Sequence, residues 1–322
     1  MIKSIFIVGT PRSGTTWLSN TLCKHSKVAC VQERISERRG GVNESAFFSY
    51  VDGTFGDLEN DNNLIQLIEI FAGSTFFILS GVDKNIFYNE RPQTYHGFFR
   101  MFMDRLADMQ GADYWLEKTP SHTFHMKEIS RYYPDVKFVA VRRDVVDQIK
   151  SFIKLDEIIS GVKTGDLSFL KKKAKLIDRL LSYYTHIKHL DYYVAKNPDK
   201  IWQIEYEDLR DSTVQVVREL CAYLGIDFEE GLLERGYTPN TSFTSKDERD
   251  TVLSKAEINC IRMLGFLMRL IPYRIYRLMY VIKRTVQKGT FPYWFFSYKI
   301  EKYGWSNVFG KGHERVTYNH DA

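Results

Sequence analysis

The feature that most constrains the fold is a glycine-rich loop at residues 9–17, with the sequence GTPRSGTTW. An apolar run at residues 5–8 precedes it, and a helical pattern with Leu18 and Leu22 follows. A strand, a tight turn and a helix start, in this order, point several backbone N–H groups and the positive end of the helix at one place. The sequence therefore predicts an anion-binding cradle on an α/β scaffold.

The glycines of this loop are spaced G-x-x-x-x-G, as in a P-loop, but Thr15 stands where a Walker loop carries lysine. Arg12 lies inside the loop, and its planar guanidinium can hold a phosphate or a sulfate at two points. Ser13, Gly14 and Thr16 add backbone and hydroxyl donors around it. We therefore expect the cradle to bind an anionic nucleotide, although it lacks the lysine that nucleoside triphosphatases use.

Apolar strand-like runs alternate with helical patterns through most of the chain. This alternation predicts an α/β fold in which a parallel sheet is flanked by helices on both faces. The predicted strands lie at residues 4–8, 27–31, 114–117, 136–141 and 201–204. The predicted helices lie at residues 16–24, 64–79, 95–109, 123–132, 145–153, 169–195 and 213–224.

The composition changes after residue 250, so we predict a nucleotide-binding domain at residues 1–250 and a basic, amphipathic, helical extension at residues 251–322. Residues 261–288 contain seven Lys or Arg residues and no acidic residue, with apolar residues at helical spacing. We favour a helix pair that packs on the main domain and keeps a solvated basic rim. The alternative is a peripheral contact with an anionic membrane surface.

Charge and cysteine content narrow the class of protein. The net charge of +5 is too small to indicate a nucleic-acid partner. The longest uncharged run, residues 70–82, is too short to cross a bilayer, and the sequence shows no secretory signal pattern. The four cysteines lack metal-site spacing, so we expect reduced thiols and a cytoplasmic location. They are Cys23, Cys30, Cys221 and Cys260.

A second motif follows the predicted strand at residues 136–141. Arg143 stands two residues after its end, and Ser151 follows Arg143 by eight residues. Eight residues are about two helical turns, so both side chains can face the same end of a site. A permanent cation and a hydroxyl donor together suit a phosphate group.

Together, the loop at residues 9–17 and the Arg143–Ser151 pair resemble the motifs of sulfotransferases, enzymes that use 3′-phosphoadenosine 5′-phosphosulfate (PAPS). The resemblance covers residues 1–245 and implies that the loop binds the 5′-phosphosulfate, while Arg143 and Ser151 bind the 3′-phosphate. One departure is Val145, where the family usually has proline. The arginine of the loop is more typical of the carbohydrate and bacterial branches.

The same resemblance implies aromatic contacts to the adenine. Trp17, directly after the double threonine, matches a residue that stacks on adenine in cytosolic members. Tyr206, in the stretch IEYEDL, matches a tyrosine that touches the adenine.

The resemblance also implies in-line sulfuryl transfer without a metal, helped by a general base and by a cation at the transferred group. Lys118, in LEKTP, matches the family's cation, and Arg12 is expected to share its task. Glu44, in NESAFF, resembles the general base of heparan sulfate sulfotransferases and is our first choice. Glu33 and His122 remain alternative bases.

The leading hypothesis is a PAPS-dependent sulfotransferase that acts on a hydroxyl of a glycan, a glycolipid or another alcohol. The first alternative is a P-loop kinase of a nucleotide or a small alcohol, which the missing Walker lysine disfavours. The second is a nucleotide-binding protein at a membrane surface that catalyses nothing. The acceptor pocket is expected between the loops at residues 53–63 and 80–94, which carry no readable code for the acceptor.

Overall fold

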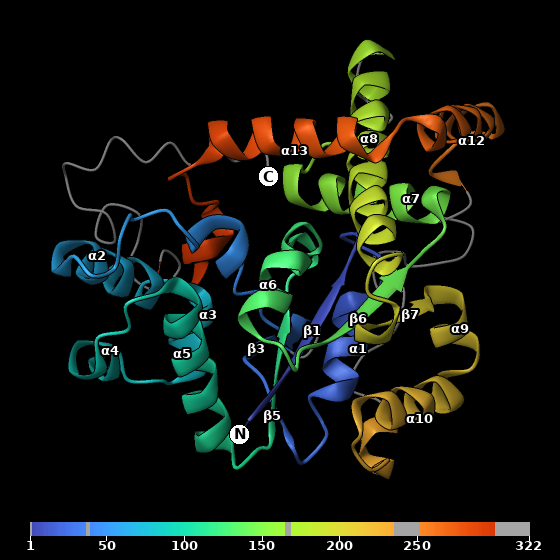
Figure 1. Cartoon of the computed structure of the whole chain (residues 1–322). Coiled ribbons are helices and arrows are strands. Elements are labelled where there is room, and N and C mark those ends of the chain that lie inside the picture. Colours follow the sequence, from blue (N-terminus) through green and yellow to red (C-terminus); the bar gives the residue numbers. More distant parts are fainter. Residues whose placement is uncertain (1, 37–38, 165–168, 235–250, 300–322) are drawn as a thin grey trace.

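The five predicted strands form one parallel sheet in the computed structural model, which describes residues 2–36, 39–164, 169–234 and 251–299 (Figure 1). The strand order is β2-β5-β1-β6-β7, and every neighbouring pair is parallel. The strands are β1 (Lys3–Gly9), β2 (Val28–Ala29), β5 (Tyr114–Lys118), β6 (Lys137–Arg142) and β7 (Ile201–Glu205). The prediction of an α/β fold with a parallel sheet is therefore confirmed.

Helices cover both faces of the sheet, so both faces of its central strand β1 are buried. On one face, Ile5 and Ile7 pack with α1, α9 and α10; on the other, Phe6 and Val8 pack with α2, α3, α5 and α6. The helices are α1 (Thr15–Leu22), α2 (Asp61–Ala72), α3 (Thr75–Ser80), α4 (Asn85–Glu90), α5 (Tyr95–Gln110), α6 (Met126–Tyr132), α7 (Val145–Ser160), α8 (Phe169–Val194), α9 (Tyr206–Asp211), α10 (Thr213–Leu224), α12 (Lys255–Leu270) and α13 (Tyr273–Gln287).

Local departures from the predicted elements have local causes. The helix expected at residues 64–79 is two helices, because α2 ends at Ala72 with Gly73 as its C-cap, and the Ser74 hydroxyl caps α3 by accepting the N–H of Phe77. A two-stranded antiparallel hairpin, β3 (Gln32–Ser36) and β4 (Arg39–Val42), was not predicted. It leads directly into the segment that carries Glu44.

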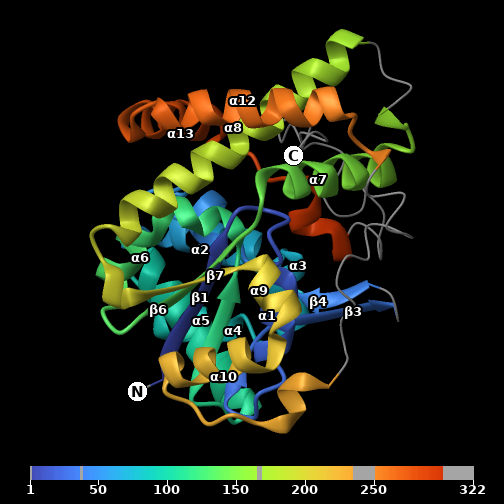
Figure 2. The ribbon, with the colours of Figure 1, turned by 90° about the vertical axis from the view of Figure 1, so that its right-hand side faces the viewer.

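Helices α12 and α13 lie at the opposite end of the molecule from α10 (Figures 1 and 2). Both pack on α8, where Ile261 and Tyr276 are buried in a cluster shared with α7. The predicted domain boundary at residue 250 falls next to residues 235–250, which lie outside the described residues, and so the division remains a prediction.

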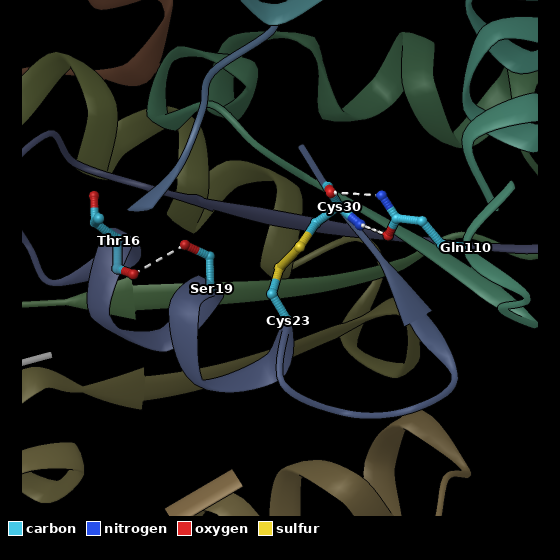
Figure 3. The surroundings of a disulfide bond; sticks show 5 residues. All are labelled: Thr16, Ser19, Cys23, Cys30 and Gln110. Carbon is cyan, nitrogen blue, oxygen red and sulfur yellow. Dashed lines mark hydrogen bonds between the residues drawn. A yellow bond between two sulfur atoms is a disulfide. The ribbon is translucent and has the colours of Figure 1, made fainter. Parts of the chain in front are cut away.

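The expectation that the cysteines are reduced is wrong for one pair. Cys23, at the end of α1, forms a disulfide with Cys30, just after β2 (Figure 3). The chain turns back after α1, so the two Cα atoms lie only 6.1 Å apart. The backbone of Cys30 also exchanges two hydrogen bonds with the Gln110 amide. The helix that begins at the glycine loop is thus covalently tied to the sheet at its other end. Cys221 and Cys260 are free thiols.

Candidate active site

The glycine loop adopts a backbone that its glycines make possible. Gly9 and Gly14 have φ values of 141° and 104°, which favour glycine. A Cβ on Gly14 would also lie 2.5 Å from Cδ2 of Tyr206. Helix α1 begins directly after Gly14, and no side chain caps its first turn. Its first N–H groups are therefore available to an anion.

The loop is also held from α7, through a residue that the sequence did not single out. The Gln148 carbonyl oxygen accepts from the Thr10 hydroxyl at 2.7 Å, and its amide nitrogen donates to the Pro11 carbonyl at 2.7 Å. The hydroxyl of Ser13 is buried and has no hydrogen-bond partner in the part of the chain that the structure describes. A buried, unsatisfied hydroxyl beside uncapped helix N–H groups fits an anionic ligand.

The two predicted phosphate-binding motifs meet at Arg12. The Arg12 Nε donates to the Ser151 hydroxyl at 3.2 Å, and Arg143 Nη1 donates to the Arg12 carbonyl oxygen at 3.0 Å. Helix α7, which carries Ser151, is capped by the Asp144 carboxylate, which accepts the N–H of Val146 at 2.9 Å. Valine at position 145 thus leaves the start of this helix capped.

Trp17 and Tyr206 form an aromatic wall beside these residues. Their rings pack edge to face with centroids 5.9 Å apart, and the Arg143 guanidinium lies 4.1 Å from the Tyr206 centroid. Both side chains are more than nine-tenths buried, and both line the main cavity. The wall combines a flat apolar surface with an adjacent cation, an arrangement suited to a purine nucleotide.

Lys118 and Glu44 come together at the start of α1. The Lys118 Nζ donates to Glu44 Oε1 at 2.6 Å and to the Thr16 hydroxyl at 3.4 Å. The lysine side chain is 3% exposed, whereas the glutamate is 34% exposed and lines the cavity. A cation and a carboxylate therefore lie together beside the cradle, while Arg12, the other predicted cation, lies at Ser151.

The other two candidate bases lie elsewhere. His122 is fully buried, and its Nε2 accepts the backbone N–H of Phe48 at 3.2 Å. Its Nδ1 must then carry the proton, and it donates to Glu117 Oε2 at 2.7 Å. Both ring nitrogens are thus engaged within the protein. Glu33 belongs to β3, and its side chain lies outside the described part of the chain.

Glu117, to which the sequence assigned no role, organises the segment after Glu44. Its Oε1 accepts from the Ser45 hydroxyl at 2.7 Å, from the Ser45 N–H at 3.2 Å and from the Thr119 hydroxyl at 2.5 Å. Burial by itself raises the pKa of this carboxyl, but His122 and these hydroxyl donors outweigh burial and lower it. The ionised Glu117 carboxylate therefore fixes Ser45, which follows Glu44, and Thr119, which follows Lys118.

We expect Glu117→Gln to lower the free energy of unfolding by about 3 kcal/mol at neutral pH. The carboxylate accepts on both oxygens, from His122 on one and from Ser45 and Thr119 on the other, whereas glutamine has a single accepting oxygen. Because the folded-state pKa of Glu117 is lowered, its stabilisation is fully present above the unfolded value of 4.5 and is lost as the pH falls through the folded value. The variant should therefore lose less stability than the wild type on acidification. Urea unfolding at several pH values measures both effects.

The exposed Glu59 provides the matched control for this prediction. Glu59→Gln should leave both the neutral stability and its acid dependence unchanged. If Glu117→Gln behaves like that control, the buried carboxylate does not organise the segment.

One cavity of about 1750 Å³ joins the cradle, Glu44 and the inner sides of α8 and α13. Of the two loops expected to form the acceptor pocket, residues 53–54 line this cavity. None of residues 80–94, all of them described, lines this cavity, so an acceptor bound in it would be walled by the first loop and not by the second. Part of this stretch is α4, where Phe87 packs in the core behind the sheet. Among the described residues, no cluster of His, Cys, Asp or Glu could hold a metal ion.

The family model described as "Sulfotransferase family" matches residues 4–230, and the chain belongs to that family. This confirms the prediction of a PAPS-dependent sulfotransferase and disfavours both alternatives, the P-loop kinase and the protein without catalysis. A comparison with curated proteins gave no match.

Solved sulfotransferase structures resemble the chain only distantly. The sulfotransferase domain of a Synechococcus olefin synthase is 18% identical, with 90% of this chain and 96% of that chain covered and a TM-score of 0.48. An Alicyclobacillus acidocaldarius sulfotransferase is 20% identical, with 86% of this chain and 99% of that chain covered and a TM-score of 0.44. A mouse sulfotransferase complexed with PAP is 11% identical, with 88% of this chain and 89% of that chain covered and a TM-score of 0.42. At these values the likeness carries no argument about the site.

Proposed function

We propose that this sulfotransferase moves a sulfuryl group from PAPS to a hydroxyl of a glycan, a glycolipid or another alcohol. The observation that carries the proposal is the Lys118–Glu44 pair at the start of α1, directly beside the glycine loop. A cation for the leaving phosphate and a carboxylate for the acceptor's proton are the two groups that in-line transfer needs. Glu44 and Thr16, the two partners of Lys118, line a cavity large enough for a nucleotide and an acceptor.

The donor would be held by residues of both motifs. The buried hydroxyl of Ser13 and the N–H groups at Thr15 and Thr16 would bind the 5′-phosphosulfate. Arg143 and Ser151, joined through Arg12, would bind the 3′-phosphate. The aromatic wall described above would contact the adenine.

PAPS supplies the sulfuryl group and a phosphate leaving group. Glu44, as a carboxylate on the cavity wall, would take the proton of the acceptor hydroxyl as its oxygen attacks sulfur. Lys118 would neutralise the charge that develops on the leaving oxygen, and its bond to Thr16 already points it toward the cradle. The two side chains must therefore exchange their mutual hydrogen bond for bonds to the substrates.

The cytoplasmic location expected from the sequence stays a proposal. It rested partly on reduced cysteines, and the Cys23–Cys30 disulfide does not support it, because such bonds are rare in reducing compartments. Subcellular fractionation with thiol labelling would decide the location and the state of this pair together.

The donor site is tested by binding of 3′,5′-adenosine bisphosphate, the desulfated product. We expect it to raise the melting temperature without Mg²⁺, and Arg143→Ala to weaken its binding by about 10- to 100-fold, since a charge-assisted contact is lost. Calorimetric titration measures the affinity.

Arg142 provides a matched control for this variant, because it lies next to Arg143 but bonds Gln203 and Asp191. Arg142→Ala should leave the affinity unchanged. Equal losses in both variants, or binding that requires Mg²⁺, would contradict the assignment of the donor site.

A further inference from the structure

Helices α12 and α13 expose apolar stripes at helical spacing. On α12 the stripe is 52–67% exposed, and on α13 it is 48–77% exposed. These residues are Met263, Phe266, Leu267 and Leu270 on α12, and Ile275, Leu278, Ile282 and Val286 on α13. The opposite faces, with Ile261 and Tyr276, are buried against α8. The packing expected from the sequence therefore leaves the outer apolar faces in solvent, which is unusual for a surface helix pair.

The charge around these stripes has one sign. Residues 258–299 contain no Asp or Glu. Arg262, Arg269 and Arg274 are exposed on the same two helices. Arg277 and Lys283 are exposed as well, and they also line the cavity. An apolar stripe flanked only by cations complements a surface that is apolar inside and anionic outside, as an acidic bilayer leaflet is.

The lengths of the two helices fit a position on a membrane surface. No helix of the described residues is long and apolar enough to cross a bilayer. Helices of this size, amphipathic and basic, lie in the interface with the apolar face among the upper acyl chains.

The inner face of α13 forms a wall of the cavity that reaches Glu44. The Tyr280 hydroxyl lies 2.6 Å from His125 Nε2, and its ring stacks on Phe124 with centroids 4.1 Å apart. Arg284 donates to the Asp52 carbonyl oxygen at 3.4 Å, which joins α13 to the segment that follows Glu44. One helix thus contacts the cavity on its inner side and presents the apolar stripe on its outer side.

We propose that α12 and α13 seat the enzyme on an anionic bilayer and that the acceptor is an amphiphilic alcohol residing in that leaflet. The acceptor part of this inference rests on the proposed function. The cavity wall under α13 includes four aromatic side chains, Phe124, Tyr192, Tyr273 and Tyr280, which can contact an apolar chain. It also includes basic side chains of α13, among them Arg277 and Arg284, which can contact a polar head group. The hydroxyl of such a molecule then reaches Glu44 from the membrane side.

The surface is tested by flotation of the full chain with vesicles of phosphatidylcholine alone or mixed with phosphatidylglycerol. We expect binding to the anionic vesicles to be at least about tenfold stronger, and to fall with salt. The double variant Leu278→Asp, Ile282→Asp should lower the affinity for anionic vesicles at least about tenfold. The control pair, Ile65→Asp with Val214→Asp, changes apolar residues of α2 and α10 that are also exposed, and it should not alter vesicle binding.

Absence of binding to anionic vesicles, or equal binding of both double variants, overturns the proposal that α12 and α13 bind a membrane. So does a dimer in solution that only Leu278→Asp with Ile282→Asp dissociates, since the face would then cover a second copy. The bisphosphate-induced rise in melting temperature, measured on the same proteins, should be unchanged in both double variants. Loss of that rise in the wild type would contradict the proposed function and not the surface.

The acceptor class is tested with radiolabelled PAPS and total lipid extract reconstituted in anionic vesicles. We expect label in the lipid phase, and at least about tenfold slower transfer by the Leu278→Asp, Ile282→Asp variant, since fewer molecules sit on the vesicle. Label found only in water-soluble products, while vesicle binding persists, overturns the amphiphilic acceptor. No label in any product, with normal binding of the bisphosphate, counts against the proposed transfer itself.

Discussion

Glu44→Gln should lower kcat for sulfuryl transfer by about 10²- to 10⁴-fold, the usual contribution of a general base. Glutamine keeps an oxygen that can accept from Lys118, so the hydrogen bond at 2.6 Å can persist while the proton acceptor is lost. Affinity for the bisphosphate should change by less than about threefold, because the Glu44 side chain accepts its hydrogen bond from Lys118 and not, among the described residues, from the glycine loop. Single-turnover transfer from radiolabelled PAPS measures the chemical step.

The matched control is Glu128, which lines the same cavity from α6. Glu128→Gln should retain nearly the full rate of the chemical step. If Glu44→Gln keeps the wild-type rate with normal donor binding, the base is another residue. Glu33→Gln would then be the next variant, since both nitrogens of His122 are engaged within the protein.

The parts of the site that could be predicted from the sequence are those carried by short spacings. The glycine loop puts its donors on consecutive residues, and Arg143 and Ser151 are two turns apart on one strand–helix unit. Such contacts follow from local geometry once a strand and a helix are recognised. The parallel sheet was predictable for the same reason, because its strands are continuous apolar runs.

The supporting contacts could not be predicted, because they join residues far apart in the chain. Gln148 reaches the loop across 138 positions at Thr10, and Glu117 reaches Ser45 across 72 positions. A lone glutamine or glutamate carries no signal of such a partner. The Cys23–Cys30 disulfide depends on how the chain turns between α1 and β2, which cysteine spacing alone does not reveal.

The exposed stripes on α12 and α13 are an intermediate case. Their periodicity was visible in the sequence, but periodicity does not tell which apolar face is buried. The packing against α8 shows that Tyr276 faces inward and that Leu278 and Ile282 face solvent. The structure therefore turns an ambiguous amphipathic pattern into a surface that can be tested.

Lys118→Met should lower kcat by about 10²- to 10³-fold, the usual loss when one preorganised charge is removed from a transition state. Methionine keeps the buried apolar stem, so the site should remain packed, and Glu44 is exposed enough for water to replace its lost partner. Lys127→Met, at an exposed lysine that lines the cavity, is the matched control and should leave the rate unchanged. A Lys118→Met variant with normal kcat and a weakened affinity for the bisphosphate would make this lysine a binding residue only.

The double variant of Glu44→Gln and Lys118→Met separates one catalytic unit from two independent groups. Lys118 and Glu44 share a hydrogen bond, so each single change also alters its partner, and the loss in the double variant should be smaller than the product of the two single losses. Single-turnover rates for the four proteins give the coupling directly. Strictly multiplicative losses would mean that base and cation act apart, and that their contact at 2.6 Å plays no part in positioning either of them.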